Sequence, residues 1–238
     1  VKNEGHNLSK KLQSFLTQDR KDYDLLIIDD NSTDDTKELI AEYQKEYPNL
    51  KYIQYSYSQG KKKAMHRTLQ DMREDYWVFS DGDCMPASDQ WLPLMLSGFE
   101  EKKSIVLGYG PFSKSKGLLN KFARFECFMT AIQYFSYAAR GIPYMGVGRN
   151  LAYKRSLFTE SNGFKKHLDI QSGDDDLFVS QVATRDNVYC QLHPNSFVYS
   201  SAPDSWGGFI RQKRRHLATS IRYNFLHQFL LSTYVLSH

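Results

Sequence analysis

The sequence has few cysteines, and none of them stands close to another. Only Cys84, Cys127 and Cys190 occur in 238 residues, and no C-x-x-C pair is present. An odd number of widely spaced thiols argues against both a disulfide framework and a zinc site. We therefore expect a reducing compartment and predict a cytoplasmic protein.

Long hydrophobic runs are also missing. No apolar run approaches the ~20 residues that a membrane-spanning helix needs, and no signal peptide is visible. Internal repeats, low-complexity stretches and clear linkers are absent, so we treat residues 1–238 as one domain. The first residue is Val1, and the last stretch, over 225–236, is apolar and aromatic. We expect a fragment of a longer protein, whose last stretch either approaches a membrane helix or forms a terminal core helix.

The charge is mild in total but uneven along the chain. Hydrophobic residues make up 41% and charged residues 24%, which is ordinary for a soluble globular protein with a sizeable core. The formal net charge is +4, yet acidic clusters lie in the middle while bases gather at 61–67 and 211–215. Local charge is therefore more informative than the total.

The first part of the chain has the pattern of a parallel α/β sheet. Apolar residues 25–28 predict a buried strand that ends on Asp29-Asp30, and residues 35–46 predict the helix that follows. A second strand is expected over 51–55, a second helix over 62–73 and a third strand over 76–79. Such β-α-β-α-β units bind ligands at the carboxyl ends of their strands.

The second part is less regular, and its most distinctive element is a long helix predicted over 118–139. Leu118, Phe122, Phe125, Met129 and Ile132 form one stripe of this helix, which predicts a core face, although its aromatic richness also suits a membrane surface. The other predicted elements are helices over 88–101, 154–160, 174–184 and from about 207, and strands near 105–108, 187–191 and 197–200.

Two carboxylates flank a glycine directly after the third predicted strand, in Asp81-Gly82-Asp83. Mg²⁺ or Mn²⁺ that also holds a diphosphate prefers a few carboxylates together with phosphate oxygens and water. The alternative is an acidic turn with glycine at a positive φ angle.

The first acidic pair and the lysine run each allow a ligand or a structural role. Asp29-Asp30 could accept hydrogen bonds from a nucleobase or ribose, or could serve only the turn that follows. Lys61-Lys62-Lys63 follows Gly60 at a predicted helix start, where backbone N–H groups and cations favour phosphate. A solvated basic face is the alternative.

Two further clusters lie in the second half. Asp174-Asp175-Asp176 packs three like charges together, so one of them could be a general base with a raised pKa, or the group could simply favour a helix N-terminus. Gln212, Arg214, Arg215 and His216 could clamp a departing diphosphate. Nucleic acid is not an expected partner, because no aromatic-interleaved patch or known motif accompanies these bases.

As a set, these segments resemble the inverting family-2 glycosyltransferases with the GT-A fold, of the membrane-associated type. The resemblance extends from the first residues to about position 216. No single segment is specific to this family, but the set as a whole is. The matching segments are Asn3-Glu4, Asp29-Asp30-Asn31-Ser32-Thr33-Asp34-Asp35-Thr36, Gly60-Lys61, Asp81-Gly82-Asp83, Gly146 to Tyr153, Asn162-Gly163-Phe164, Gly173-Asp174-Asp175 and Gln212-Lys213-Arg214-Arg215-His216.

The resemblance implies an α/β GT-A fold, which is Rossmann-like with a mixed, mainly parallel sheet flanked by helices. Residues 1–110 would form the nucleotide-binding half of a single catalytic domain, and residues 111–238 the acceptor-binding half. The implied partners are a UDP- or GDP-sugar donor, a saccharide or lipid-linked acceptor of the cell-envelope type, and a membrane surface. The protein would then work at the cytoplasmic face of that membrane.

The resemblance also implies roles for single residues. Asp30 would meet the nucleotide base, Asp81 the ribose or metal, and Asp83 the Mg²⁺ or Mn²⁺ that bridges the donor diphosphate. Glu4 and Arg149 belong to matching motifs and are candidates for substrate binding. The catalytic base is the aspartate of a Glu-Asp pair in the family, and the count along this chain leaves both Asp175, which we prefer, and Asp174.

The implied reaction is a direct displacement at the anomeric carbon, with inversion. An aspartate would take the proton of the acceptor hydroxyl while the metal and the bases Lys61, Lys63, Arg214 and Arg215 stabilise the charge on the leaving diphosphate.

Three departures from the family pattern stand out. The strand that usually precedes Asn3-Glu4 is absent, so part of the nucleotide site is expected to be missing. His216 replaces the family's tryptophan, which argues against processive synthesis, and an Asp-Asp replaces the Glu-Asp pair.

Two other classes of protein remain as alternatives. A phosphorylation receiver domain shares the acidic pocket suggested by Asp29-Asp30 and Asp83, but it is about half as long and leaves the later clusters unexplained. A non-catalytic binding protein would use only the basic helix and the apolar tail.

Overall fold

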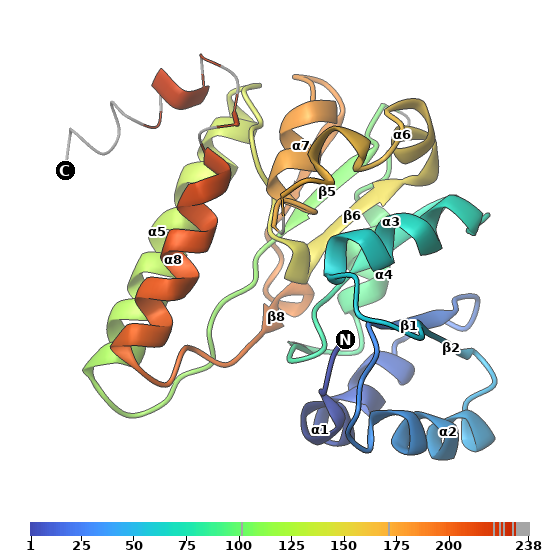
Figure 1. The fold of residues 1–238 in the computed structure, drawn as a ribbon. Coiled ribbons are helices and arrows are strands. Elements are labelled where there is room, and N and C mark those ends of the chain that lie inside the picture. The colour runs from blue at the N-terminus through green and yellow to red at the C-terminus, as the bar shows by residue number, and fades with distance from the viewer. Residues whose placement is uncertain are drawn as a thin grey trace.

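Helices and strands alternate through the first part of the chain, as Figure 1 shows for the computed structural model. The structure describes residues 1–100, 102–170, 172–220, 222–223, 225, 227–229 and 231. The first elements are α1 (Gly5–Leu16), β1 (Leu25–Asp29), α2 (Thr36–Glu46), β2 (Leu50–Gln54), α3 (Lys61–Asp71) and β3 (Tyr76–Phe79). The three predicted strands and both predicted helices of this part are therefore confirmed.

The second part contains the long helix α5 (Leu118–Ala139), whose predicted bounds are confirmed at both ends. It also contains a strand that the sequence does not predict, β6 (Leu151–Lys154), at the end of the Gly146 to Tyr153 segment. The other elements are β4 (Met85–Pro86), α4 (Trp91–Ser97), β5 (Ile105–Gly108), α6 (Arg155–Glu160), α7 (Asp176–Val182), β7 (Val188–Gln191), β8 (Val198–Tyr199) and α8 (Trp206–Ser220), with short 3₁₀ turns at Gly148–Asn150, Lys165–His167 and Pro194–Ser196.

The strands form a mixed arrangement. β1 and β2 pair in parallel, and a separate sheet has the order β3-β6-β5-β7. β6 runs antiparallel to both of its neighbours, whereas β5 and β7 are parallel, and β4 pairs antiparallel with β8. The α/β class and the mixed sheet are thus confirmed, but antiparallel pairings outnumber parallel ones among the described strands, because β6 is antiparallel to both neighbours and β4 is antiparallel to β8.

α1 aligns the start of the chain with the end of β1. Its apolar side chains Leu8, Leu12 and Phe15 recur at helical spacing and are all buried. Just ahead of the helix, the Val1 ammonium donates to the Ile28 carbonyl, and the Val1 carbonyl accepts from Asp30 N at 3.0 Å. These contacts hold the Asn3-Glu4 segment beside the carboxyl end of β1.

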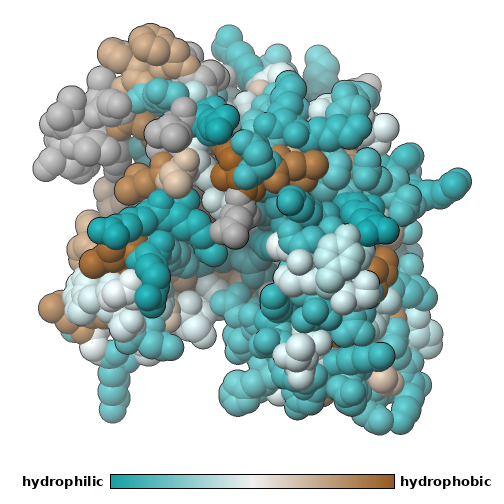
Figure 2. Space-filling view, viewed as in Figure 1, coloured by the Kyte–Doolittle hydropathy of each residue, from teal (hydrophilic) through white to brown (hydrophobic). Residues whose placement is uncertain are grey.

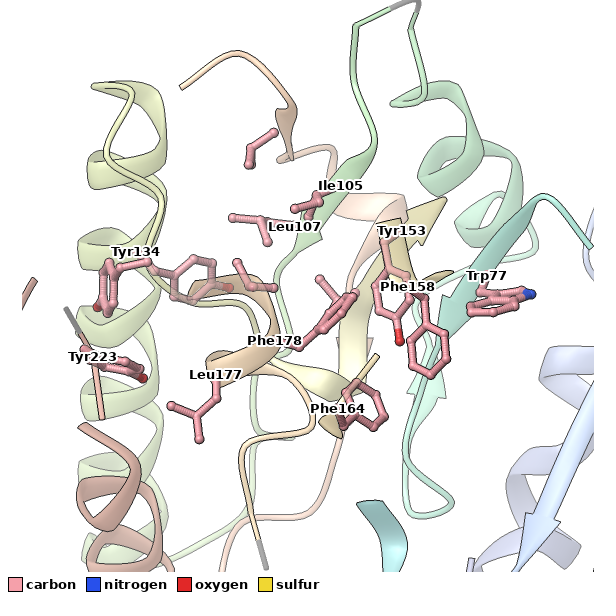
Figure 3. Close-up of a cluster of buried hydrophobic side chains, with 14 of the residues drawn as sticks. Trp77, Ile105, Leu107, Tyr134, Tyr153, Phe158, Phe164, Leu177, Phe178 and Tyr223 are labelled. Atoms are coloured by element: carbon pink, nitrogen blue, oxygen red, sulfur yellow. The ribbon is translucent and has the colours of Figure 1, made fainter. Parts of the chain in front are cut away.

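Aromatic side chains fill the core between the four-stranded sheet and α7 (Figure 3). Tyr153 of β6 is only 1% exposed, and its ring centroid lies 4.6 Å from that of Phe79 and 4.7 Å from that of Phe178. Each aromatic side chain buried in this way contributes about 1.5–3 kcal/mol to stability. The core therefore fixes the start of α7 against the strands that carry the acidic segments.

The apolar stripe of α5 faces solvent, and the prediction of a core face is wrong. Leu118 is 74% exposed and Phe125 60%, whereas the opposite face buries Ala123, Ala131 and Tyr134. The Tyr134 hydroxyl donates to the Gly108 carbonyl at 2.9 Å. Two small alanines let α5 approach the rest of the protein closely, so the larger apolar side chains are left on the outside.

The end of the chain is described only in part. Of the apolar stretch over 225–236, the structure describes Phe225, His227–Phe229 and Leu231, so both predictions for this stretch remain open. Among the described helices, none has the length and apolar character required to span a bilayer.

Candidate active site

One lysine joins two acidic segments that lie far apart in the sequence. The Lys61 ammonium is 2.7 Å from Asp81 Oδ1 and 3.0 Å from Asp174 Oδ2. Desolvation lowers the pKa of Lys61, but the nearby carboxylates of Asp174 and Asp81 outweigh it and raise that pKa well above its ordinary value. Lys61 therefore stays charged, and it brings the start of α3, the end of β3 and the approach to α7 together.

A tight turn after β3 presents the two carboxylates of the Asp81-Gly82-Asp83 segment. Cys84 N donates to the Asp81 carbonyl at 3.0 Å, and the Lys11 ammonium of α1 donates to the Asp83 carbonyl. A side chain at Gly82 would lie 2.7 Å from a methyl carbon of Val1 and 3.4 Å from Glu4 Cγ. A larger residue at position 82 would therefore displace the side chain of Val1, which passes directly against the turn.

The donor set of this turn fits a hard divalent cation. Ligand atoms of Asp81, Asp83 and Cys84 lie within 4.8 Å of one another. Burial, followed by the charges of Asp81 and Asp83, raises the pKa of the Cys84 thiol to about 12, so the sulfur stays protonated and is a poor ligand for Mg²⁺ or Mn²⁺. The two carboxylates would hold the ion, with its remaining positions left for other oxygen ligands.

The first acidic pair shapes the loop that precedes Lys61. Asp30 accepts hydrogen bonds from Ser58 Oγ at 2.7 Å, Gln59 N at 2.8 Å and Gly60 N at 2.9 Å. Burial raises the pKa of Asp30, but these bonds outweigh it and the pKa is lowered. Asp30 is therefore a carboxylate that holds the loop. Its bond to Gly60 N reaches the residue directly before Lys61.

Asp29 serves the turn that follows β1. It is fully buried, and it accepts hydrogen bonds from Ser32 N at 2.8 Å and from the Tyr52 hydroxyl at 2.5 Å. These bonds satisfy a buried carboxylate and fix the loop beyond β1. The turn-forming alternative for Asp29 thus has direct support in the structure.

The three aspartates before and at the start of α7 have three different sets of partners. Asp174 pairs with Lys61 as described above, and its side chain is 11% exposed. Asp176 is buried and accepts from the Thr219 hydroxyl at 2.5 Å and the Tyr223 hydroxyl at 2.8 Å, which ties α7 to the end of α8. Asp175 has no cation directly bonded to it among the described residues.

Asp175 has the environment of a titrating acid. Its Oδ2 accepts from Gly148 N at 2.7 Å and its Oδ1 from Asp176 N at 2.8 Å. Burial, followed by the like charges of Asp174 and Asp176, raises its pKa to about 7, although Lys61 and the bond from Gly148 act in the opposite direction. A carboxyl group with this pKa can exchange a proton near neutral pH.

Lys62 is a positioning residue that the sequence analysis does not single out. Its side chain is buried, and its ammonium donates to the His167 carbonyl at 2.7 Å and to the Ser172 carbonyl. Lys62 thereby holds the segment that leads into the aspartate triplet. Lys62 lies four and seven residues before the buried His66 and Leu69, and this helical spacing could have indicated that Lys62 points inward. Lys63, the next residue along the helix, is exposed.

Arg149 links the middle of the molecule to the strands around β8. Its guanidinium donates to Ser200 Oγ at 2.7 Å and lies 4.7 Å from the centre of the Phe112 ring. Burial raises the pKa of Asp81, but the charge of Lys61 and, after it, the charge of Arg149 act in the opposite direction. The pKa of Asp81 is therefore lowered. Arg149 therefore lies within electrostatic reach of the Asp81 turn.

No side chain of the basic segment of α8 forms an ion pair with Asp81, Asp83, Asp174 or Asp175 among the described residues. Lys213 forms an ion pair with Glu126 of α5, and Arg214, Arg215 and His216 are exposed on α8. A buried side-chain oxygen of Gln212 has no hydrogen-bond partner within the described part of the chain. Figure 2 shows the surface hollowed between the α5–α8 pair and the part that carries α1 and β1.

The family models match this chain over almost its whole length. The model described as glycosyl transferase family 2 matches residues 1–161, and the model described as glycosyl transferase family group 2 matches residues 107–237. The chain belongs to glycosyltransferase family 2. Membership of this family excludes the alternative hypothesis of a phosphorylation receiver domain.

Curated relatives match this family-2 glycosyltransferase over stretches of 73 to 223 residues. The GalNAc(5)-diNAcBac-PP-undecaprenol beta-1,3-glucosyltransferase of Campylobacter jejuni is 34% identical over 77 residues, which cover 32% of this chain and 25% of the relative. The chain spans only about a quarter to a third of the length of the first relatives it matches.

Solved structures share the fold of this family-2 glycosyltransferase at low sequence identity. A mannosyltransferase from Pyrobaculum calidifontis, in complex with GDP-Man and Mn²⁺, matches with a TM-score of 0.72 at 18% identity, covering 94% of this chain and 63% of that one. TarS of S. aureus in complex with UDP-GlcNAc matches with a TM-score of 0.63 at 16% identity, covering 86% and 57%. The GT-A fold is thereby confirmed.

Proposed function

We propose that this protein is an inverting glycosyltransferase that moves a sugar from a nucleoside diphosphate sugar to a saccharide or lipid-linked acceptor. The observation that carries the proposal is the convergence of two acidic segments on Lys61, with Asp81 on one side of the ammonium and Asp174 on the other. One segment fits a cation, and the other contains a carboxyl group that titrates near neutral pH. A metal-dependent transferase that inverts the anomeric carbon uses both functions next to each other.

The donor end of the site is assigned to the nucleotide-binding half, residues 1–110. Asp30 and Glu4 would contact the nucleoside, and Lys61 and Lys63 the diphosphate. Asp81 and Asp83 would hold Mg²⁺ or Mn²⁺, which when bound stabilises negative charge on the diphosphate. The Mn²⁺ and GDP-Man named for the mannosyltransferase, and the UDP-GlcNAc named for TarS, support a metal and make GDP- and UDP-sugars the first donors to test.

Asp175 is assigned as the catalytic base, with Asp174 as the alternative. The base takes the proton of the acceptor hydroxyl while that oxygen attacks the anomeric carbon, and the bond between this carbon and the diphosphate oxygen breaks. A single displacement inverts the configuration at the anomeric carbon. The ion pair between Asp174 and Lys61 favours Asp175, because a carboxylate held by a cation is a weaker base.

The acceptor half, residues 111–238, would contribute Arg149, Gln212, Arg214, Arg215 and His216. The partnerless buried oxygen of Gln212 supports a ligand at this segment. The undecaprenol-linked substrate named for the Campylobacter jejuni relative makes a lipid-linked acceptor, at the cytoplasmic face of a membrane, the first to test.

Titration calorimetry with UDP and with GDP, each with and without Mn²⁺, tests the donor site directly. We expect binding of one nucleotide that depends on the metal; absence of binding by a full-length protein would contradict the proposal. A panel of nucleotide sugars assayed for diphosphate release then identifies the donor, and proton NMR of the product reports whether the anomeric configuration is inverted.

A further inference from the structure

A band of large apolar side chains covers the outer side of α5 and continues onto the start of α8. The exposed fractions are 74% for Leu118, 45% for Phe122, 60% for Phe125, 50% for Phe128 and 42% for Ile132. These positions recur every three or four residues, so they share one side of the helix. A continuous exposed apolar band of this kind usually marks a surface that binds something.

The band extends to α8 through aromatic contacts. The Phe122 ring centroid lies 5.6 Å from that of Trp206, and Trp206 and Ile210 are 48% and 49% exposed. Figure 2 shows hydrophobic side chains at the surface along the α5–α8 pair, at the left of the view. The two helices therefore present one outward apolar surface, which we call the α5–α8 surface: Leu118, Phe122, Phe125, Phe128, Ile132, Trp206 and Ile210.

Basic residues flank this surface without acidic partners. Residues 113–125 contain Lys114, Lys116, Lys121 and Arg124 but no aspartate or glutamate. In the described part of the chain, none of these four cations forms an ion pair with a carboxylate. An apolar surface with unpaired bases at its border is complementary to a partner that is both apolar and negatively charged.

A groove beside α5 combines both properties in one place. It has a volume of about 300 Å³, and it lies between the segment from Tyr109 to Phe112 and the exposed side of α5. Lys121 and Arg124 line it together with Phe125 and Phe128. Two cations beside two exposed rings suit a phosphate group that carries hydrocarbon.

We propose that the α5–α8 surface docks the protein onto an anionic phospholipid membrane, with both helices lying in the plane of the interface. Aromatic rings are favoured at the depth of the lipid headgroups, and lysine and arginine beside them attract anionic lipids. The opposite face of α5 packs on β5 through Tyr134, so docking through the outer face leaves the site around Lys61, Asp81 and Asp174 unobstructed. The inference goes beyond the transfer reaction and does not depend on it.

Flotation with lipid vesicles tests this docking surface. The full chain is mixed with vesicles of equal parts phosphatidylcholine and phosphatidylglycerol, and separately with vesicles of phosphatidylcholine alone. Two double variants probe the two properties of the surface: Phe125→Ser with Phe128→Ser, and Lys121→Glu with Arg124→Glu. Tyr76→Ser is the matched control, because Tyr76 is 48% exposed on β3, at the edge of the sheet opposite to β7.

We expect the wild-type protein and Tyr76→Ser to float only with the anionic vesicles, and salt to weaken this binding. Each double variant should reduce partitioning about tenfold or more. Circular dichroism and metal-dependent nucleotide binding show whether the variants remain folded and competent for donor binding.

Three results would overturn the proposal. The first is equal binding of the wild type to neutral and anionic vesicles, and the second is flotation of the double variants like the wild type. The third is a wild-type protein that binds no vesicles and forms a dimer, which the Phe125→Ser, Phe128→Ser variant converts to a monomer. The last result would identify the surface as an interface between two copies. A protein that floats as expected but releases no diphosphate would contradict the transferase proposal alone.

Discussion

The Asp81 turn and the aspartate triplet lie on either side of Lys61. They differ in how deeply their carboxylates are buried and in the groups that these carboxylates bind. The Asp81 side chain is 38% exposed in a turn after β3, whereas that of Asp174 is 11% exposed ahead of α7. Among the described residues, Asp81 uses only Oδ1 in its ion pair with Lys61, which leaves Oδ2 for a further ligand. In the triplet, Asp174 and Asp176 are already engaged by an ion pair and by two hydroxyl groups.

This contrast explains how similar residues can serve different chemistry. Two partly exposed carboxylates on a turn can hold a divalent cation, because the ion replaces the water that they would otherwise bind. Three crowded and less exposed carboxylates cannot all stay charged, so the pKa of Asp175 is raised. The following changes test whether the two groups are as different as their surroundings indicate.

Asp175→Asn should have the largest effect. Removal of a general base should lower kcat by about 10²–10⁴-fold, because the acceptor hydroxyl keeps its proton. Donor binding measured by calorimetry should stay near the wild-type value. Asp174→Asn is the matched variant: if it stops turnover while Asp175→Asn remains active, the base is Asp174.

Asp83→Ala should act on the other side of Lys61. Loss of one of the two proposed metal ligands should weaken metal-dependent donor binding by about 100-fold, because the charge of the diphosphate is no longer compensated. Calorimetry with and without Mn²⁺ measures this change. The exposed Asp89, on the chain segment after the turn, supplies the control Asp89→Ala; equal loss in both variants would argue against a metal site at the turn.

Lys62→Met should destabilise the fold. The carbonyl groups of His167 and Ser172 would lose their buried donor, which costs about 1–3 kcal/mol of unfolding free energy. Urea denaturation measures the difference. Lys63→Met, on the exposed side of the same helix, should change the free energy of unfolding by less than about 0.5 kcal/mol; similar losses in the two variants would show that Lys62 has no special role.

Lys61→Met should shift the pH dependence of turnover to higher pH. The positive charge of Lys61 lowers the pKa of Asp175, so its removal should raise that pKa by about one pH unit. A pH profile of kcat under donor saturation measures the shift. Lys63→Met should leave the midpoint in place, and an unchanged midpoint in Lys61→Met would contradict the coupling of the two acidic groups through Lys61.

Asp175 should also make the free energy of unfolding depend on pH. Its pKa is raised in the folded state to about 7, so folding is weakened as the pH rises from its ordinary pKa near 4 toward 7. Asp175→Asn should therefore be more stable than the wild type above pH 7, and no more stable than it below pH 4. Thermal unfolding across this range measures the difference, and equal curves would contradict the raised pKa.

Most of the secondary structure could be predicted from local patterns. The apolar run before Asp29 predicts β1, and the 22-residue periodic pattern of α5 predicts both of its ends. Three elements escape prediction, among them the two-residue strand β4, which is too short to leave a pattern. α1 has clear helical spacing that the sequence analysis does not use, while β6 lies in a glycine-containing motif, Gly146 to Tyr153, whose pairing with β3 and β5 is a long-range contact.

The sequence predicts candidate residues for the site but not how they are arranged. Acidic pairs after strands indicate where ligands bind, and these pairs do lie at the ends of β1 and β3. Which lysine of Lys61-Lys62-Lys63 points inward depends on the packing of α3. The sequence also does not show that the apolar stripe of α5 faces solvent. Helical spacing shows that apolar residues share one face of a helix, but it does not show what that face contacts.

The sequence by itself therefore determined the α/β class, the positions of most helices and strands, and the chemical types of the clustered residues. These properties follow from local propensity, spacing and charge. Only the tertiary structure decided that Lys61 joins Asp81 to Asp174, that Asp176 is used to anchor α8, and that the α5–α8 surface faces outward. Each of these depends on contacts between residues far apart in the chain, and their burial and mutual electrostatics exist only after folding.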